Sequence, residues 1–468
     1  MLRSLTALLI ALWCFTACTS SDHRATNSVP PPVQDSVPAP APPVRDTLTT
    51  LIPGSYLESV TNGGQAYILY IPRSFRDSLP MPLMVCFDPQ GNGRVPVHRY
   101  ASLADEFGFI LAGSNQVRNG LGIDASASMA RELAAAVLEK MKTTHAGLFL
   151  CGFSGGAKVA LVAPGNMKGV SGVVHCGAGL PDGIPAPTVP TYGVTGNRDM
   201  NYSEVIEFVN RLGRQPMHHL DITDGKHAWP ETTDMRRAFS WCKVLACKSG
   251  GNCERPILQQ FTRQINTLAA RTTDPIQRMR IYRCGIDCLQ GLSPVPEWEN
   301  SVQRLMKDPV YQQSIPEDSR ALSAELNRRQ FLLDAFRSQE EDWWSHVIGD
   351  LQKRKQDPMN DRLLGYISLA CYSLTRQAME QGNMPEVARL NRIYLLADQE
   401  NAEPNFLAAK LFSQVGQKDS VLSYLKRSVQ YGFKDLSRLE SETAMRALLS
   451  SADQRDLEEG IRKNQSDW

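Results

Sequence analysis

Short apolar runs rich in β-branched and aromatic residues alternate with helical patterns between residues 51 and 246. The runs that predict strands are 66–71, 83–87, 109–113, 148–151, 170–175, 190–195 and 218–222. The clearest helical patterns are 127–141, 157–163, 202–212 and 234–245. Buried strands that alternate with helices predict a mostly parallel sheet covered on both faces, and therefore an α/β domain. Site residues should directly follow strands, because such sheets bind ligands at the carboxyl ends of their strands.

The length of the chain indicates how many domains to expect, and its net charge bears on the class of partner. The chain has 468 residues, more than the ~250–300 at which a single core stops growing, so at least two domains are expected. The 50 Lys and Arg residues balance 49 Asp and Glu residues. A formal net charge of +1 gives no electrostatic reason to expect nucleic acid as a partner.

A second, all-α domain is predicted over 254–468, where strand signals disappear and amphipathic helical patterns continue to the end. Small and apolar positions recur 34 residues apart, most clearly over 367–436, as with Gly382 and Gly416. This is the period of the tetratricopeptide repeat. A generic helical bundle is the alternative. Such helices can bind a partner protein, or they can pack on the first domain and shape its crevice.

The amino terminus has the pattern of an export signal. Arg3 precedes an apolar run that is shorter than the roughly 20 residues of a membrane-spanning helix, so 1–17 is predicted to be a signal peptide. The run ends in Phe-Thr-Ala-Cys18, which resembles the lipobox of bacterial lipoproteins. The resemblance implies lipidation of Cys18 and attachment to a bilayer of the bacterial cell envelope, periplasmic or surface-exposed. The alternative is an ordinary cleaved signal, with Cys18 incidental.

Residues 18–50 form the predicted connection between that anchor and the first domain. The segment is rich in Ser, Thr, Pro and Ala and includes Pro30-Pro31-Pro32. Such a composition cannot bury a core, and it favours extended polyproline II backbone. We therefore expect a linker.

A Gly-x-Ser-x-Gly string, residues 152–156, lies between the predicted strand 148–151 and the following helix. This context predicts a nucleophile elbow, a turn so tight that glycine must flank the serine and the hydroxyl of Ser154 projects outward. The N–H of Gly155, at the start of the helix, can bind a developing oxyanion. A glycine-rich turn without chemistry is the alternative.

His227 follows the last predicted strand and precedes the last helix of the first domain. A serine hydroxyl is a weak nucleophile at neutral pH and needs a base to take its proton, and imidazole is the most common one. His227 is therefore the candidate base, with His175, at the end of a strand, as the best competing histidine.

Asp199 follows the strand 190–195 and is the candidate acid that orients the imidazole. The alternatives are a capping role for Asp199 at the helix that begins near residue 202, and Asp221 or Asp224 as the acid. The order Ser154, Asp199, His227 is that of the α/β-hydrolases.

The segment from about residue 56 to 241 resembles the polyhydroxybutyrate depolymerase and feruloyl esterase group of α/β-hydrolase carboxylesterases. The matching pieces are the elbow 152–156, Gly196-x-x-Asp199-x-x-Tyr202 and Gly225-x-His227-x-Trp229-Pro230. The resemblance implies hydrolysis of a small-molecule or polymer ester through an acyl-enzyme on Ser154, without a cofactor. A serine peptidase of the same fold, and a catalytically weak envelope scaffold, are the alternatives.

One loop departs from this group. Relatives usually carry His-Gly after the strand 83–87, whereas this chain has Asp88-Pro89-Gln90. Pro89 has no N–H, so Gln90 is the expected second oxyanion donor beside the helix start. An ion pair of Asp88 with Arg94 or Arg118 would hold the loop in place.

The cysteines allow several pairings. Cys247 and Cys253 flank a Gly-rich turn and can form a disulfide, whereas Cys284 and Cys288 are four residues apart on a helix and can meet another pair. A metal site built from these four residues is the alternative. Their spacings of six and four, without a histidine nearby, do not favour it, and no metal is predicted.

Overall fold

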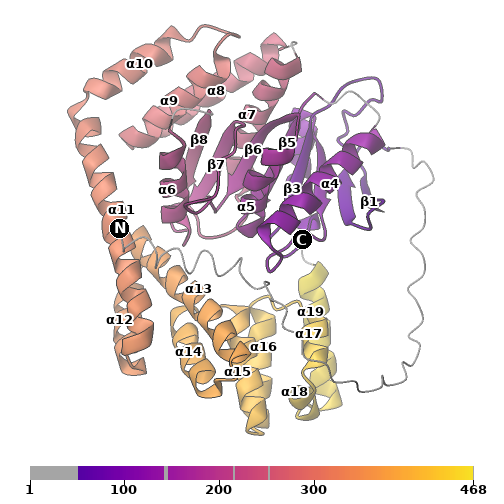
Figure 1. Ribbon diagram of the computed structural model, residues 1–468, viewed down its shortest axis with the longest axis vertical. Coiled ribbons are helices and arrows are strands. Elements are labelled where there is room, and N and C mark those ends of the chain that lie inside the picture. The colour runs from indigo at the N-terminus through magenta and orange to yellow at the C-terminus, as the bar shows by residue number, and fades with distance from the viewer. Residues whose placement is uncertain (1–50, 142–145, 214–216, 251–252, 467–468) are drawn as a thin grey trace, which may run out of the picture.

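The computed structural model describes residues 51–141, 146–213, 217–250 and 253–466 (Figure 1). The predicted signal peptide, Cys18 and the linker lie outside these residues. Among the described helices, none combines the length and apolarity needed to cross a bilayer.

The centre of the molecule is an eight-stranded sheet with the strand order β1-β2-β4-β3-β5-β6-β7-β8. The strands are β1 (Tyr56–Val60), β2 (Ala66–Tyr70), β3 (Leu83–Phe87), β4 (Ile110–Ser114), β5 (Leu148–Phe153), β6 (Val170–Cys176), β7 (Thr191–Gly196) and β8 (His218–Thr223). β1 and β2 pair antiparallel, as do β2 and β4, and every pair from β4 to β8 is parallel. The predicted α/β class is therefore confirmed.

β1 is not among the predicted strands. It is an edge strand whose residues alternate between exposed and half-buried, so it lacks the continuous apolar run that marks the central strands. The buried strands, in contrast, lie within two residues of their predicted bounds.

Helices cover both faces of the sheet. One face packs against α4 (Ile123–Met141), α5 (Gly155–Val162) and α6 (Tyr202–Leu212), and the other against α2 (Arg94–Arg99), α3 (Ala101–Phe107) and α7 (Thr232–Gly250). Successive residues of a strand point to opposite faces, so Met84 joins one core and Val85 the other. This arrangement is the α/β-hydrolase fold.

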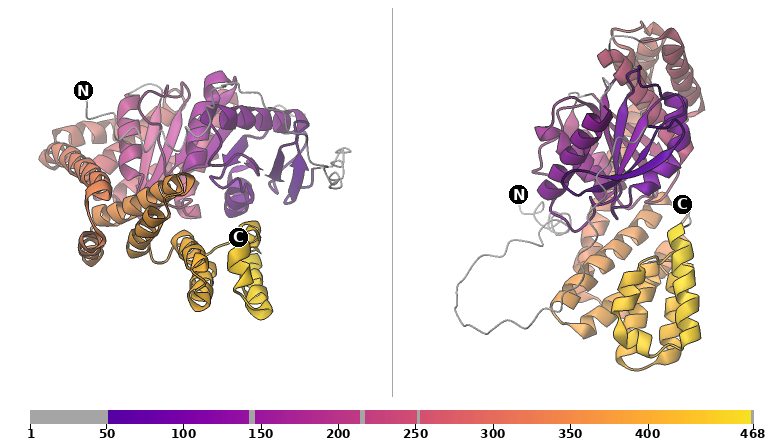
Figure 2. Two further views of the ribbon diagram at one scale, coloured as in Figure 1. Left: turned by 60° about the horizontal axis from the view of Figure 1, so that its bottom comes forward. Right: turned by 90° about the vertical axis from the view of Figure 1, so that its right-hand side faces the viewer.

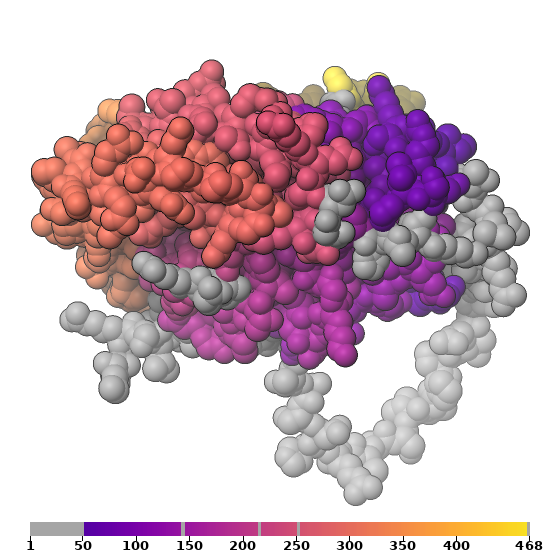
Figure 3. Space-filling model, turned by 90° about the horizontal axis from the view of Figure 1, so that it is seen from above, coloured from indigo at the N-terminus to yellow at the C-terminus, as the bar shows by residue number. Residues whose placement is uncertain are grey.

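The rest of the described chain is helical. The helices are α8 (Arg255–Arg271), α9 (Pro275–Leu289), α10 (Pro296–Lys307), α11 (Pro309–Ser338), α12 (Glu341–Lys353), α13 (Pro358–Glu380), α14 (Met384–Ala397), α15 (Ala402–Gln414), α16 (Lys418–Gln430), α17 (Leu436–Ser441), α18 (Thr443–Ala447) and α19 (Ser451–Ser466). Phe261, Ile281 and Trp298, from the first three of these helices, belong to one core with the α7 side of the sheet. Seen from above, this helical layer and the sheet region form one continuous surface (Figure 3).

α11 leads from that layer to α12–α19, which lie below the sheet (Figures 1 and 2). Here α13 packs on α14, and α15 on α16. Gly382 and Gly416, both with φ +70°, follow the first helix of each pair. The 34-residue spacing thus corresponds to two successive helical hairpins, and their relation to tetratricopeptide repeats stays a prediction.

Candidate active site

Ser154 occupies a strained turn between β5 and α5. Its φ of 52° and ψ of −122° make it the one non-glycine residue with positive φ in the described part of the chain. A Cβ at Gly152 would fall 2.1 Å from the carbonyl oxygen of Gly156, so the turn closes only with glycine there. Backbone strain of this kind persists where the surroundings enforce it, and it holds the hydroxyl at the carboxyl end of the strand.

The three predicted side chains meet at this edge of the sheet. Nε2 of His227 lies 3.0 Å from Oγ of Ser154, and Nδ1 lies 2.8 Å from Oδ1 of Asp199. They come from the ends of three strands: Ser154 from β5, Asp199 from the acid loop (residues 196–201) after β7, and His227 from the histidine loop (residues 224–230) after β8. In the tautomer that fits both bonds, the serine hydroxyl donates to Nε2 and Nδ1–H donates to the carboxylate.

Further contacts hold the acid in place. The backbone N–H of Asn201 donates to Oδ1 of Asp199 at 2.7 Å, and Nδ2 of Asn201 donates to the carbonyl of Gly177 at 2.9 Å. The carboxylate is 98% withdrawn from solvent. Asn201, not Asp199, is the N-cap residue of α6, so the capping alternative for Asp199 is wrong. The sequence Asp199-Met200-Asn201 before α6 is compatible with this hydrogen bond, because an aspartate side chain often accepts the backbone N–H two residues further on.

Of the two competing acids, Asp221 is engaged elsewhere and Asp224 is exposed to solvent. Asp221 accepts a hydrogen bond from the Tyr192 hydroxyl and another from Nε of Arg237 at 2.6 Å. The side chain of Asp224 is 87% exposed, with a carboxylate oxygen 3.9 Å from Nε of Arg198.

His175, the competing base, is fully buried in the core. Its ring packs edge-on against Phe208, and Nδ1 donates to the carbonyl of Ala178 at 2.8 Å. Burial lowers the pKa of His175 to about 4, which keeps the imidazole neutral.

The aromatic ring of Phe153 lies 4.6 Å from the imidazole ring of His227 and forms one wall of the site.

The structure corrects the predicted second oxyanion donor. The N–H of Gln90 donates to Oδ1 of Asp88 at 2.9 Å, so an oxyanion would have to compete with a carboxylate for it. The reason is local, because an aspartate at the start of a turn folds back onto the N–H two residues on. Gly155 begins α5, where the first N–H groups of a helix have no partner within the helix.

Asp88 holds this loop, but not through the predicted arginines. Its Oδ2 accepts the indole N–H of Trp229 at 2.9 Å, and its side chain is buried. Arg94 pairs instead with Glu58, from the exposed edge strand. The loop that should stabilise the oxyanion is therefore tied to the histidine loop through one carboxylate.

Asn119 lies over the helix start. A Cβ at Gly155 would fall 1.8 Å from Oδ1 of Asn119, so the carboxamide borders the N–H predicted to bind the oxyanion. The backbone N–H of Asn119 donates to the carbonyl of Pro89 at 2.8 Å, which joins its loop to the Asp88 turn. Nothing in the local sequence predicts that the loop of Asn119 crosses the elbow.

Helix α13 contacts both catalytic loops. Arg362 donates to the carbonyl of Asn197 at 2.5 Å, within the acid loop. Asp361 lies 3.5 Å from Nη1 of Arg198 and 3.7 Å from Nζ of Lys226, the neighbour of the candidate base. The helical region therefore supports the two loops that carry the acid and the base.

Lys434 brings a positive charge of the helical region within electrostatic reach of Asp88. Lys434, between α16 and α17, is half-buried, which lowers its pKa, and the negative charge of Asp88 opposes this effect. A lysine from the helical region thus adds positive potential beside the turn that contains Gln90.

No protein-family model and no curated protein matches the chain. Among solved structures it is similar to an α/β serine hydrolase without a lid from Xanthomonas campestris, at 19% identity over 42% of this chain and 96% of that chain, with a TM-score of 0.34. A fluorophosphonate-binding serine hydrolase from Staphylococcus aureus matches at 16% identity over 41% and 99%, with a TM-score of 0.32. An S-formylglutathione hydrolase from Agrobacterium tumefaciens matches at 13% identity over 40% and 93%, with a TM-score of 0.34.

Proposed function

We propose that the chain is a serine hydrolase that cleaves carboxylic esters through an acyl-enzyme on Ser154. The observation that carries the proposal is the hydrogen-bonded series from Ser154 through His227 to Asp199, with bonds of 3.0 and 2.8 Å. A serine on a strained turn, a base in reach of its proton and a buried acid behind the base form a complete nucleophile system.

In the first half-reaction, Oγ of Ser154 attacks the ester carbonyl carbon and Nε2 of His227 takes the hydroxyl proton. The oxyanion binds the N–H of Gly155 at the start of α5. His227 then returns the proton to the departing alkoxide. In the second half-reaction water attacks the acyl-enzyme in the same way and releases the acid.

The oxyanion geometry favours esters over amides. The N–H of Gln90 is bonded to Asp88, and loss of one oxyanion donor typically costs about 10²–10³ in turnover. An amide has the poorer leaving group and needs more stabilisation of its tetrahedral intermediate. A site with a compromised donor set therefore suits an ester of a small molecule or polymer better than a peptide.

A fluorophosphonate probe tests the nucleophile directly, since it phosphonylates an activated serine. We expect the full chain to be labelled at Ser154 and the Ser154→Ala variant to remain unlabelled. Ser171→Ala, on the neighbouring strand β6, is the matched control and should label like wild type. Absence of labelling in a wild-type protein with native circular dichroism would favour the scaffold alternative and overturn the proposal.

We also propose that Cys18 carries the lipid of an envelope anchor. The support is the lipobox resemblance of residues 15–18, since several acyl chains at ~0.8 kcal/mol per buried methylene hold a protein on a bilayer. Cys18→Ala is expected to move the protein from the membrane to the soluble fraction. Cys14→Ala, within the apolar run, should leave it in the membrane. Unchanged membrane association of the Cys18 variant would contradict lipidation.

A further inference from the structure

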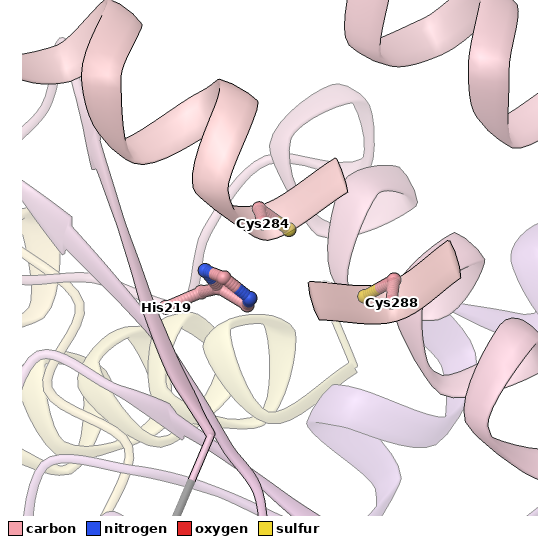
Figure 4. A group of neighbouring side chains, drawn as sticks. All are labelled: His219, Cys284 and Cys288. Carbon is pink, nitrogen blue, oxygen red and sulfur yellow. The ribbon is translucent and has the colours of Figure 1, made fainter. Parts of the chain in front are cut away.

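Three metal-ligating side chains converge behind the sheet, away from the catalytic edge. His219 projects from β8 toward the sulfur atoms of Cys284 and Cys288 on α9 (Figure 4). One ligand atom from each residue lies within 4.8 Å of the other two, and all three residues are buried. From this juxtaposition we infer that His219, Cys284 and Cys288 form a zinc site.

The imidazole of His219 is the strongest evidence that an ion binds between these three side chains. Nε2 of His219 is buried and has no hydrogen-bond partner. A buried polar atom without a partner costs about 1–3 kcal/mol, and a metal ion would satisfy it.

The donor set and its charge select the ion. Two sulfurs and one imidazole suit zinc or copper, whereas calcium and magnesium prefer oxygen ligands. Two thiolates and a neutral imidazole cancel the charge of Zn²⁺, so the buried site would carry no net charge. Cu⁺ with the same ligands would leave a net negative charge in the core, which is costly in a low dielectric.

The geometry needs little adjustment. A tetrahedral ion with bonds of about 2.1–2.3 Å holds its ligand atoms roughly 3.5 Å apart, and the three ligand atoms here already lie within 4.8 Å of one another. Binding converts both thiols to thiolates and releases two protons to solvent.

An adjoining cavity offers the fourth position. Its volume is about 20 Å³, enough for one water molecule, and its walls include His219, Cys284 and the ion-paired Asp221. A water ligand there would complete the tetrahedron.

The spacing of the cysteines leaves the partners of Cys284 and Cys288 open. Cys253 lies beside Cys247. Burial, and next the hydrogen bond between the two thiols, raise the pKa of the Cys253 thiol to about 12. Cys284 and Cys288 meet a histidine of the sheet instead of that pair. An ion there would cross-link α9 of the helical region to β8, the strand that leads into the histidine loop.

Metal content tests the site independently of any hydrolase activity. The full chain, purified under reducing conditions, dialysed against Zn²⁺ and then freed of excess metal, should retain one zinc per chain by elemental analysis. His219→Ala and Cys284→Ser should each lower retention at least tenfold. Cys371→Ser, which removes another buried thiol on α13, is the matched control and should retain zinc.

Cobalt substitution decides the matter if the variants fold poorly. Wild-type protein loaded with Co²⁺ should show the near-ultraviolet charge-transfer absorption of cobalt–thiolate bonds together with the strong visible bands of a tetrahedral site. A folded wild-type chain that retains neither ion, a Co²⁺ spectrum without thiolate bands, or a native disulfide between Cys284 and Cys288 found by mass spectrometry would overturn the inference.

Discussion

Replacing Asp199 by asparagine is expected to lower kcat for an ester substrate by about 10⁴-fold. Oδ1 of Asp199 accepts the Nδ1–H of His227 at 2.8 Å and thereby selects the tautomer whose Nε2 can receive the serine proton. An asparagine amide can present an N–H to Nδ1 instead, and this stabilises the tautomer that carries its proton on Nε2. Steady-state hydrolysis of a p-nitrophenyl ester measures the effect, with little expected change in KM.

Asp224→Asn is the matched control, since it makes the same chemical change within the histidine loop. The Asp224 side chain is 87% exposed, and the nearest Arg198 nitrogen lies 3.9 Å away, so screening by solvent leaves the pair weak. Turnover of this variant should stay within about twofold of wild type. A comparable loss in both variants, or none in Asp199→Asn, would contradict the assignment of the acid.

Replacing Glu325 by alanine is expected to lower the free energy of unfolding by about 3–5 kcal/mol. Glu325, on α11, is almost fully buried and accepts from Arg329 at 2.6 Å and from Nε of Arg362 at 2.9 Å. Removing the carboxylate leaves two guanidinium groups uncompensated where solvent cannot hydrate them well. Urea denaturation followed by circular dichroism measures the change.

Glu317→Ala provides the comparison, because Glu317 lies on the exposed part of the same helix and accepts a hydrogen bond from the exposed Gln313 side chain. Its effect should stay within about 0.5 kcal/mol. Since Arg362 also donates to the carbonyl of Asn197, loss of Glu325 should in addition lower kcat more than it raises KM. A Glu325→Ala protein as stable as wild type would exclude this cluster as a structural support.

The central strands were predictable because burial on both faces leaves an unbroken apolar run, as in β3 and β5. The edge strand β1 was not, since only one of its faces is even half-buried. The short helix α2 also lacked a signal, having six residues with Pro96 among them. Prediction therefore succeeded where a single local pattern coincided with full burial.

The candidate site was likewise only partly predictable from the sequence. The positions of Ser154, Asp199 and His227 followed from one rule, that functional side chains lie just after parallel strands. The partners of Asp88 did not, because they depend on where Trp229, 141 residues further on, comes to rest. From the sequence, Arg94 and Arg118 were plausible partners for Asp88. Only the packing of the folded chain shows that Trp229 is the partner instead.

The amino-acid sequence by itself determined the central strands, the sharp elbow at Ser154 and the order of Ser154, Asp199 and His227 along the chain, because side-chain periodicity and backbone sterics act over a few residues. The tertiary structure alone decided that Asp88 accepts the indole N–H of Trp229, that Arg362 supports the acid loop, and that His219 meets two cysteines. Each of these outcomes depends on buried groups satisfying one another's hydrogen-bonding or ligating capacity. For Arg362 and for the histidine, those partners lie dozens of residues away and come together only when the layers pack.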